Sequence, residues 1–154
     1  MKLSKKCEYA LKALTCLGAP GAPEILSIQA IARQERIPKK FLEQVLLALK
    51  KAGLVQSNRG KAGGYTLRMA PAGITLGDIV RAVDGPLAPL ACASRTAPVR
   101  CAECPDLEHC WLRALMLEVG DGLSEVLNHT TLATACRRAA ASRQRGAQAP
   151  MYHI

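Results

Sequence analysis

The chain has 154 residues, of which 49% are hydrophobic and only 3% aromatic, and its formal net charge is +9. This length allows one compact domain with an appended helix, and an aliphatic core favours helices over a β-sandwich. The sequence offers three scattered histidines, no phosphate loop, and no uncharged run of about 18 residues, which argues against an enzyme and against a membrane-spanning protein.

The positive charge is confined to the N-terminal half of the chain. Residues 1–68 contain thirteen Lys or Arg and four Asp or Glu, whereas residues 69–154 contain eight of each. A merely solvated basic face would also show such an excess. The asymmetry nevertheless favours a surface that binds nucleic-acid phosphates.

The order of the first elements predicts a winged helix-turn-helix over residues 1–84. Apolar residues at helical spacing run from Leu3 to Leu17, and Ser27 is the expected N-cap of a short helix over 27–35. A second helix is predicted over 38–51, with an inward stripe of Phe41, Leu42, Val45, Leu46 and Leu49. Residues 54–56 and 65–67, joined through glycines, predict a two-stranded β-wing, and Thr75 is expected to cap a further helix.

Polar residues of these elements are the candidate DNA contacts. On the 38–51 helix they are Lys39, Lys40, Glu43 and Gln44, whose side chains can read base edges or bind phosphate. Ser27 and Gln29 begin the preceding helix, where phosphates bind. The wing tip supplies Asn58, Arg59 and Lys61, and an Arg there can enter the minor groove.

The second half of the chain predicts a loop, a long helix and a tail. Residues 85–105 include four prolines and three cysteines, which is typical of an irregular loop. From Asp106 an apolar three-four rhythm predicts a helix of about 25 residues within a dimerisation segment, 106–135, because such an outlying stripe needs a partner helix. Residues 136–154, with four arginines, are predicted to be a disordered basic tail.

Four of the seven cysteines, Cys92, Cys101, Cys104 and Cys110, fall within nineteen residues. The odd cysteine count and the lack of an export signal indicate reduced thiols in a cytoplasmic protein rather than disulfides. The density of thiols favours an iron–sulfur cluster of two or four irons, with zinc as the main alternative and bystander thiols as the third. Cys7 and Cys16 are expected in the core, and Cys136 is expected to be incidental.

Several motifs in one order resemble a known family. They are residues 1–11, 41–44, 49–55 and 59–65, and the segment 74–80 with the sequence Ile-Thr-Leu-Gly-Asp-Ile-Val. Over about residues 1–135 the chain is similar to the IscR/NsrR-type winged helix-turn-helix transcriptional regulators. The resemblance implies a bacterial, homodimeric, DNA-binding protein with a long crossing helix and, in many members, an iron–sulfur cluster held by three cysteines.

The resemblance assigns the last two family cysteines to Cys104 and Cys110, and the first to Cys92 or Cys101. A site with four thiolates is also open, because this chain has an extra thiol and a longer first interval. Arg113 stands where some members have a histidine ligand, and Glu8 stands where others supply a carboxylate from the partner chain. The function expected is a homodimer on a near-palindromic double-stranded DNA operator, gated by the cluster. The alternative is the same DNA-binding repressor with a zinc-stabilised or thiol-redox site.

Overall fold

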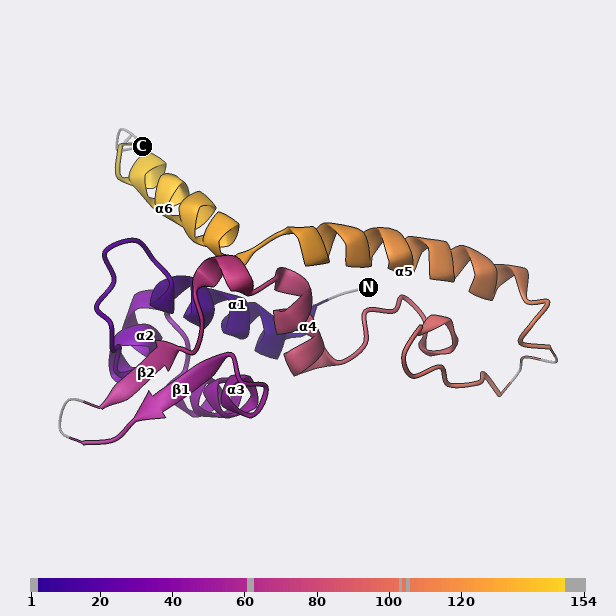
Figure 1. Ribbon diagram of the computed structural model, residues 1–154, viewed down its shortest axis with the longest axis horizontal. Helices are drawn as coiled ribbons and strands as arrows, with labels where there is room; N and C mark the ends of the chain where they lie inside the picture. Colours follow the sequence, from indigo (N-terminus) through magenta and orange to yellow (C-terminus); the bar gives the residue numbers. More distant parts are fainter. Residues whose placement is uncertain (1–2, 61–62, 103, 105, 149–154) are drawn as a thin grey trace, which may run out of the picture.

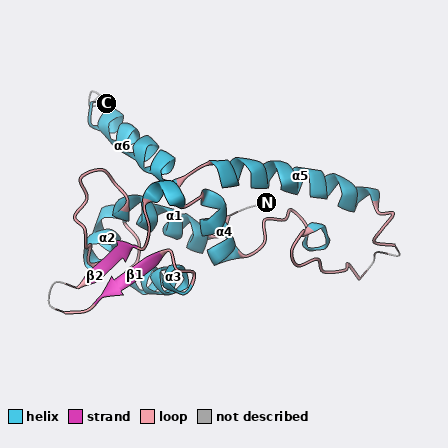
Figure 2. Ribbon diagram, in the orientation of Figure 1, coloured by secondary structure: helices cyan, strands magenta, loops and turns pink. Residues whose placement is uncertain are grey.

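In the computed structural model, residues 3–60, 63–102, 104 and 106–148 are described, and they form six α-helices and one two-stranded sheet (Figures 1 and 2). The head contains α1 (Lys5–Leu17), α2 (Ile28–Glu35), α3 (Lys39–Lys51), β1 (Val55–Asn58), β2 (Gly64–Leu67), η1 (Pro71–Gly73) and α4 (Leu76–Asp84). A long loop with the short helix η2 (Ala91–Ala93) leads to α5 (Trp111–His129), which extends from the head as an arm, and α6 (Leu132–Gln148) follows (Figure 1). The predicted mainly α, winged helix-turn-helix fold is confirmed.

Side-chain caps fix where the helices of the head begin. The Ser4 hydroxyl accepts the Cys7 N–H at 3.0 Å, and the Ser27 hydroxyl accepts the Ala30 N–H at 3.2 Å. Thr75 and Asp78 form a reciprocal capping box at the start of α4. Because these bonds satisfy backbone donors that a helix leaves unpaired, the caps predicted at Ser27 and Thr75 are confirmed.

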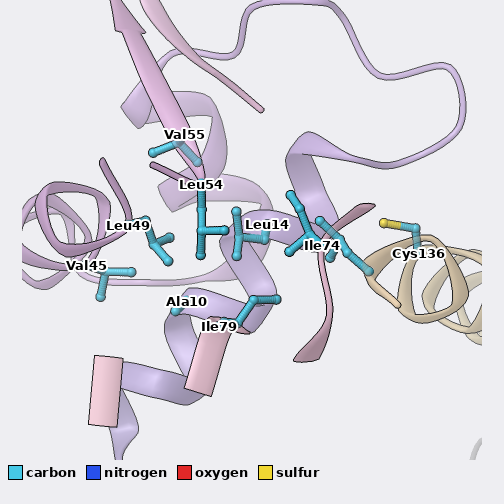
Figure 3. Packing of buried hydrophobic residues seen from close by; sticks show 10 residues of the cluster. Ala10, Leu14, Val45, Leu49, Leu54, Val55, Ile74, Ile79 and Cys136 are labelled. Carbon is cyan, nitrogen blue, oxygen red and sulfur yellow. The ribbon is translucent and has the colours of Figure 1, made fainter. Parts of the chain in front are cut away.

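The core of the head is aliphatic and draws on almost every element. Leu14 of α1, Leu49 of α3, Ile74 and Ile79 lie completely buried together (Figure 3). Cys136 of α6 joins the same cluster, as does Leu132. A second cluster, around Ile31 of α2, fixes the helix-turn-helix. Both clusters pack against one side of α3, so its opposite side is exposed.

The wing is attached to the segment that precedes α2. β1 and β2 pair antiparallel from Val55 with Leu67 to Asn58 with Gly64. At the base, the Tyr65 N–H donates to the Leu26 carbonyl at 2.8 Å, and the Leu26 N–H donates back at 3.1 Å. A Cβ at Gly64 would lie 2.4 Å from the Leu26 carbonyl oxygen, so only glycine permits this approach. The wing and α2 therefore form one unit.

Backbone contacts also fix the arm where it leaves the head. The Leu76 N–H donates to the Thr130 carbonyl at 2.9 Å, and the Leu132 N–H donates to the Ile74 carbonyl at 2.8 Å. This bridge lies between α5 and α6 and joins both to η1 and α4.

The structure differs from three expectations. The helix expected from Asp106 begins only at Trp111, because the Asp106 carboxylate accepts the N–H groups of Glu108 and His109 and closes a turn of its own. Phe41 is not in the core: its side chain is 58% exposed, since the buried stripe of α3 is narrow and begins at Leu42.

The disordered tail expected over 136–154 is wrong for residues 136–148, which belong to α6. Alanine-rich sequence favours the helix, and the burial of Leu132 and Cys136 docks it against α1. Cys136 is therefore a core residue and not incidental. Residues 149–154 lie outside the described part of the chain.

Candidate functional site: a helix-turn-helix surface and a four-cysteine loop

The candidate reading residues of α3 share its exposed side. Lys39, Lys40, Glu43 and Gln44 are all exposed, while Leu42, Val45, Leu46 and Leu49 anchor the helix behind them. The helix can therefore present hydrogen-bond donors and acceptors to the major groove of DNA while its buried side stays packed.

The start of α2 and the wing tip lie on one surface. Gln29, Asn58 and Arg59 line an open hollow of about 340 Å³, together with Gly60 and the two glycines of the wing. The Ser27 hydroxyl lies at the same helix start, where it accepts the Ala30 N–H and caps α2. It therefore contributes to a site for anions by holding the start of the helix in place. Lys61, the remaining wing candidate, lies outside the described residues.

The cysteine loop joins α4 of the head to the arm. Cys92 is 4% exposed in η2, Cys101 is exposed, Cys104 is half-buried, and Cys110 is the N-cap residue of α5. The Cys104 thiol donates to the Asp106 carbonyl at 3.2 Å. All four predicted thiols therefore belong to one loop, although they differ in accessibility.

Neighbouring thiols of the loop contribute to shifts in the pKa of Cys101, Cys104 and Cys110. The pKa of Cys101 is raised, mainly because its thiol contacts the Cys92 thiol. Desolvation and the nearby Cys104 thiol raise it further. The pKa of Cys104 is raised by desolvation, by the Cys110 thiol and, to a smaller extent, by the Cys92 thiol. By contrast, the backbone N–H groups of Arg113 and Leu112 at the start of α5 lower the pKa of Cys110, as helix N-termini do for thiols.

Arginines that sequence reasoning did not assign fasten the loop to α5. Arg113 donates to the Cys92 carbonyl at 3.0 Å, and Arg95 makes two hydrogen bonds to the Asp121 carboxylate at 2.6 and 3.1 Å. The backbone near Pro89 also lies against α5, at Gly120. These contacts join residues more than twenty positions apart, so no local sequence signal indicates them.

The donor set of the loop fits a metal group in chemistry. Thiolates are the ligands of iron–sulfur clusters and of structural zinc, and the four thiols are neighbours. Within the described residues, however, no three Cys, His, Asp or Glu side chains already converge on a point that could hold a metal ion.

The carboxylate candidate Glu8 is on α1 and pairs within its own helix. Its oxygens lie 2.7 Å from the Lys5 ammonium and 3.7 Å from that of Lys12, and the Lys5 contact lowers the pKa of Glu8.

No helix in the described part of the chain combines the length and the apolar character needed to cross a bilayer.

The sequence is similar to those of known proteins. Residues 3–138 match the Rrf2 family, described as an iron-dependent transcriptional regulator. A putative rrf2-like helix-turn-helix regulator of Rhodobacter capsulatus is 44% identical over 120 residues, 76% of this chain and 80% of the relative. CymR of Bacillus subtilis is 34% identical over 132 residues, covering 86% of this chain and 87% of CymR.

Solved structures agree with the sequence relatives. CymR, the global cysteine regulator of B. subtilis, superposes with a TM-score of 0.72 at 33% identity, over 90% of this chain and 98% of CymR. IscR of T. potens superposes with a TM-score of 0.67 at 28% identity, over 99% of this chain and 97% of that IscR chain. These relatives are regulators and not enzymes. With its winged helix-turn-helix and its match over residues 3–138, the chain belongs to the Rrf2 family of transcriptional regulators.

Proposed function

We propose that the chain acts as a homodimer whose affinity for a near-palindromic operator depends on an iron–sulfur cluster held by the cysteine loop. The observation that carries the proposal is the position of the loop. Its four thiols lie between α4, the last helix of the DNA-reading head, and α5, the exposed apolar arm. A group bound there contacts both parts of the molecule that a dimeric reader must keep in register.

The reading surface contributes Lys39, Lys40, Glu43 and Gln44 to the major groove. Gln29 and the N-cap of α2 hold phosphates, and Asn58 and Arg59 of the wing reach the adjacent minor groove. Two heads related by twofold symmetry present two α3 helices to successive major grooves. The exposed candidates on α3 and the shared hollow of α2 and wing support this assignment.

Cys104 and Cys110, with Cys92 or Cys101, are the proposed ligands, and Glu8 of a second copy is the proposed carboxylate. When bound, an iron–sulfur cluster supplies sensitivity to oxidants, nitric oxide and iron supply. The residues of the loop do the rest. Arg113 and Arg95 hold its Cys92 end on α5, and the lowered pKa of Cys110 favours the thiolate that a metal requires.

The cysteine loop is coupled to the DNA-reading helix through its first end, where it leaves α4. Asp84, the last residue of α4, accepts hydrogen bonds from the Ser4 N–H at 2.9 Å and from the Ser4 hydroxyl. Ser4 caps α1, and α1 packs on α3. A change in the loop thus reaches the recognition helix through two packed helices. It regulates only to the extent that the two states differ in DNA affinity.

Cysteine variants purified without air test the proposal. We expect Cys104→Ala and Cys110→Ala to lose visible absorbance and iron, and to change operator affinity at least about tenfold, a coupling of about 1.4 kcal/mol. Cys136→Ala, which removes a thiol outside the loop, should keep both properties. Loop variants with the absorbance and operator affinity of the parent would refute the cluster assignment.

The same DNA-binding regulator with a zinc or thiol-redox site is the second candidate. The two-residue gap between Cys101 and Cys104 is typical of zinc ligands, and the related CymR is named a cysteine regulator. Protein prepared without air that contains zinc but no iron, and that is colourless, would establish this alternative.

A further inference from the structure

A groove runs between α1 and α3, and its described lining includes Ala82 of α4 but no residue of β1 or β2. It consists of two adjoining hollows, of about 620 and 240 Å³, and both are lined by Lys6 of α1 and Gln44 of α3. The larger hollow continues past Leu47 to Lys51 at the end of α3, and the smaller one reaches Phe41 at its start. We call this feature the α1–α3 groove.

Two lysines of the groove, Lys6 and Lys51, are free to meet a phosphate. Lys6 and Lys51 are exposed, and among the described residues no carboxylate lies within ion-pair distance of either ammonium. Lys5 and Lys12 on the same helix as Lys6 are different, because both pair with Glu8. Lys5 also lines the smaller hollow, so Lys6 is the lysine of α1 that brings an unpaired charge to the groove.

Apolar side chains lie between these charges. Phe41 is 58% exposed and Leu47 is 54% exposed, although both belong to a helix whose other large aliphatic residues are buried. Alternating cationic and apolar groups suit a DNA strand, in which phosphates alternate with deoxyriboses and the thymine methyl offers an apolar contact in the major groove.

The position of Gln44 indicates which molecule would occupy the groove. It is a proposed base-reading residue and it lines both hollows, so a strand read by Gln44 must pass over the groove. The major groove is about 12 Å wide and is bounded by two phosphate backbones. The wing and the start of α2 meet one backbone, and the other needs a counterpart beyond α3.

We propose that the α1–α3 groove is this counterpart, a second DNA-backbone site in which Lys6 and Lys51 bind phosphates and Phe41 and Leu47 contact deoxyribose or a thymine methyl. The proposal rests on DNA recognition by α3, as proposed above. It extends the DNA-binding surface onto α1, which carries none of the DNA contacts proposed above.

Salt-dependent binding of the full-length protein tests this site. The probe is a fluorescent duplex selected by the protein from a random pool, with a scrambled duplex beside it. Each of Lys6→Ala and Lys51→Ala should weaken binding to both duplexes several-fold and lower the slope of log Kd against log salt by about 0.9, as expected for one lost phosphate contact. Phe41→Ala should weaken binding to the selected duplex and leave the salt slope unchanged.

Lys12→Ala is the matched control on α1, because its charge is already paired with Glu8, and it should keep the parental slope. A purely structural role of Lys6 or Lys51 would not change the slope. If Arg59→Ala weakens binding but the Lys6 and Lys51 variants retain the parental slope, the groove is not a DNA site although the proposed function stands. If the parent protein selects no duplex, both proposals fail.

Discussion

Cys16 shows how the position of one thiol determines its chemistry. It lies on α1 with 1% of its surface exposed, beside Glu35 of α2 and Arg143 of α6. Burial, and then the negative charge of Glu35, raises the pKa of the Cys16 thiol to about 11. Cys7 is buried in the same way and its pKa is also raised to about 11. These two thiols are core residues, as the sequence predicts, and differ from Cys110 in the loop.

The raised pKa of Cys16 predicts an alkaline loss of stability. The folded protein keeps the thiol proton up to about pH 11, whereas the unfolded chain releases it near its ordinary value of 9.0. The unfolded state therefore binds fewer protons in this window, and the free energy of unfolding falls as pH rises from 9 to 11, by on the order of 1 kcal/mol. Urea unfolding at a series of pH values measures the fall. Cys16→Ala should show a shallower fall; an identical pH profile would contradict the raised pKa.

Element by element, local signals explain which parts could be predicted. Caps at Ser27 and Thr75 and the glycines of the wing act within a few residues, so the sequence alone predicts α2, α4 and the wing. The roles of the α3 residues in reading DNA stay predictions. The conformation of the cysteine loop depends instead on Arg113 with Cys92 and Arg95 with Asp121. Such contacts form only after α5 has packed beside the loop, and a sequence pattern cannot indicate them.

The C-terminal helix α6 was missed for a related physical reason. It is polar and arginine-rich, and its inward side consists of a few residues spaced one turn apart, of which Leu132 and Cys136 are buried. Farther along, Arg143 forms an ion pair with Glu35 of α2. The Glu35 side chain is only 11% exposed, so its carboxylate depends on Arg143 for a charged partner.

Removing the ion pair should loosen α6. Arg143→Ala leaves the Glu35 carboxylate nearly buried without its partner, and we expect a loss of about 1–2 kcal/mol in the free energy of unfolding. Glu35→Gln combined with Arg143→Ala should cost less than the sum of the two single changes, because the uncompensated charge is gone. A double-mutant cycle by urea unfolding measures the coupling. Arg145→Ala, which changes an exposed arginine of the same helix, is the control, and strict additivity of the pair would exclude the predicted contact.

At the scale of the whole molecule, the head has a completed core whereas the arm does not. Large apolar side chains remain exposed along α5, most of all Trp111 at 75% and Val126 at 65%, with Leu112, Leu115 and Val119 between them. They follow the three-four rhythm that predicts a helix pairing with another helix. The opposite side of α5 holds the cysteine loop through Asp121 and Gly120. The arm is therefore placed to join two copies while each copy keeps its own loop.

Charges placed on the exposed stripe of α5 should separate the two copies. In Leu115→Glu combined with Val119→Glu, two carboxylates would have to be buried against a second apolar helix, at a cost of several kcal/mol. We expect sedimentation velocity to show a dimer for the parent and a monomer for the variant, with helical content unchanged by circular dichroism. Operator affinity should fall at least about a hundredfold, since a monomer holds only one half-site. Glu118→Gln, which changes the same helix without adding a charge to the stripe, should remain dimeric. A parent that sediments as a monomer, or a doubly charged variant that stays dimeric, would show that the copies do not join through α5.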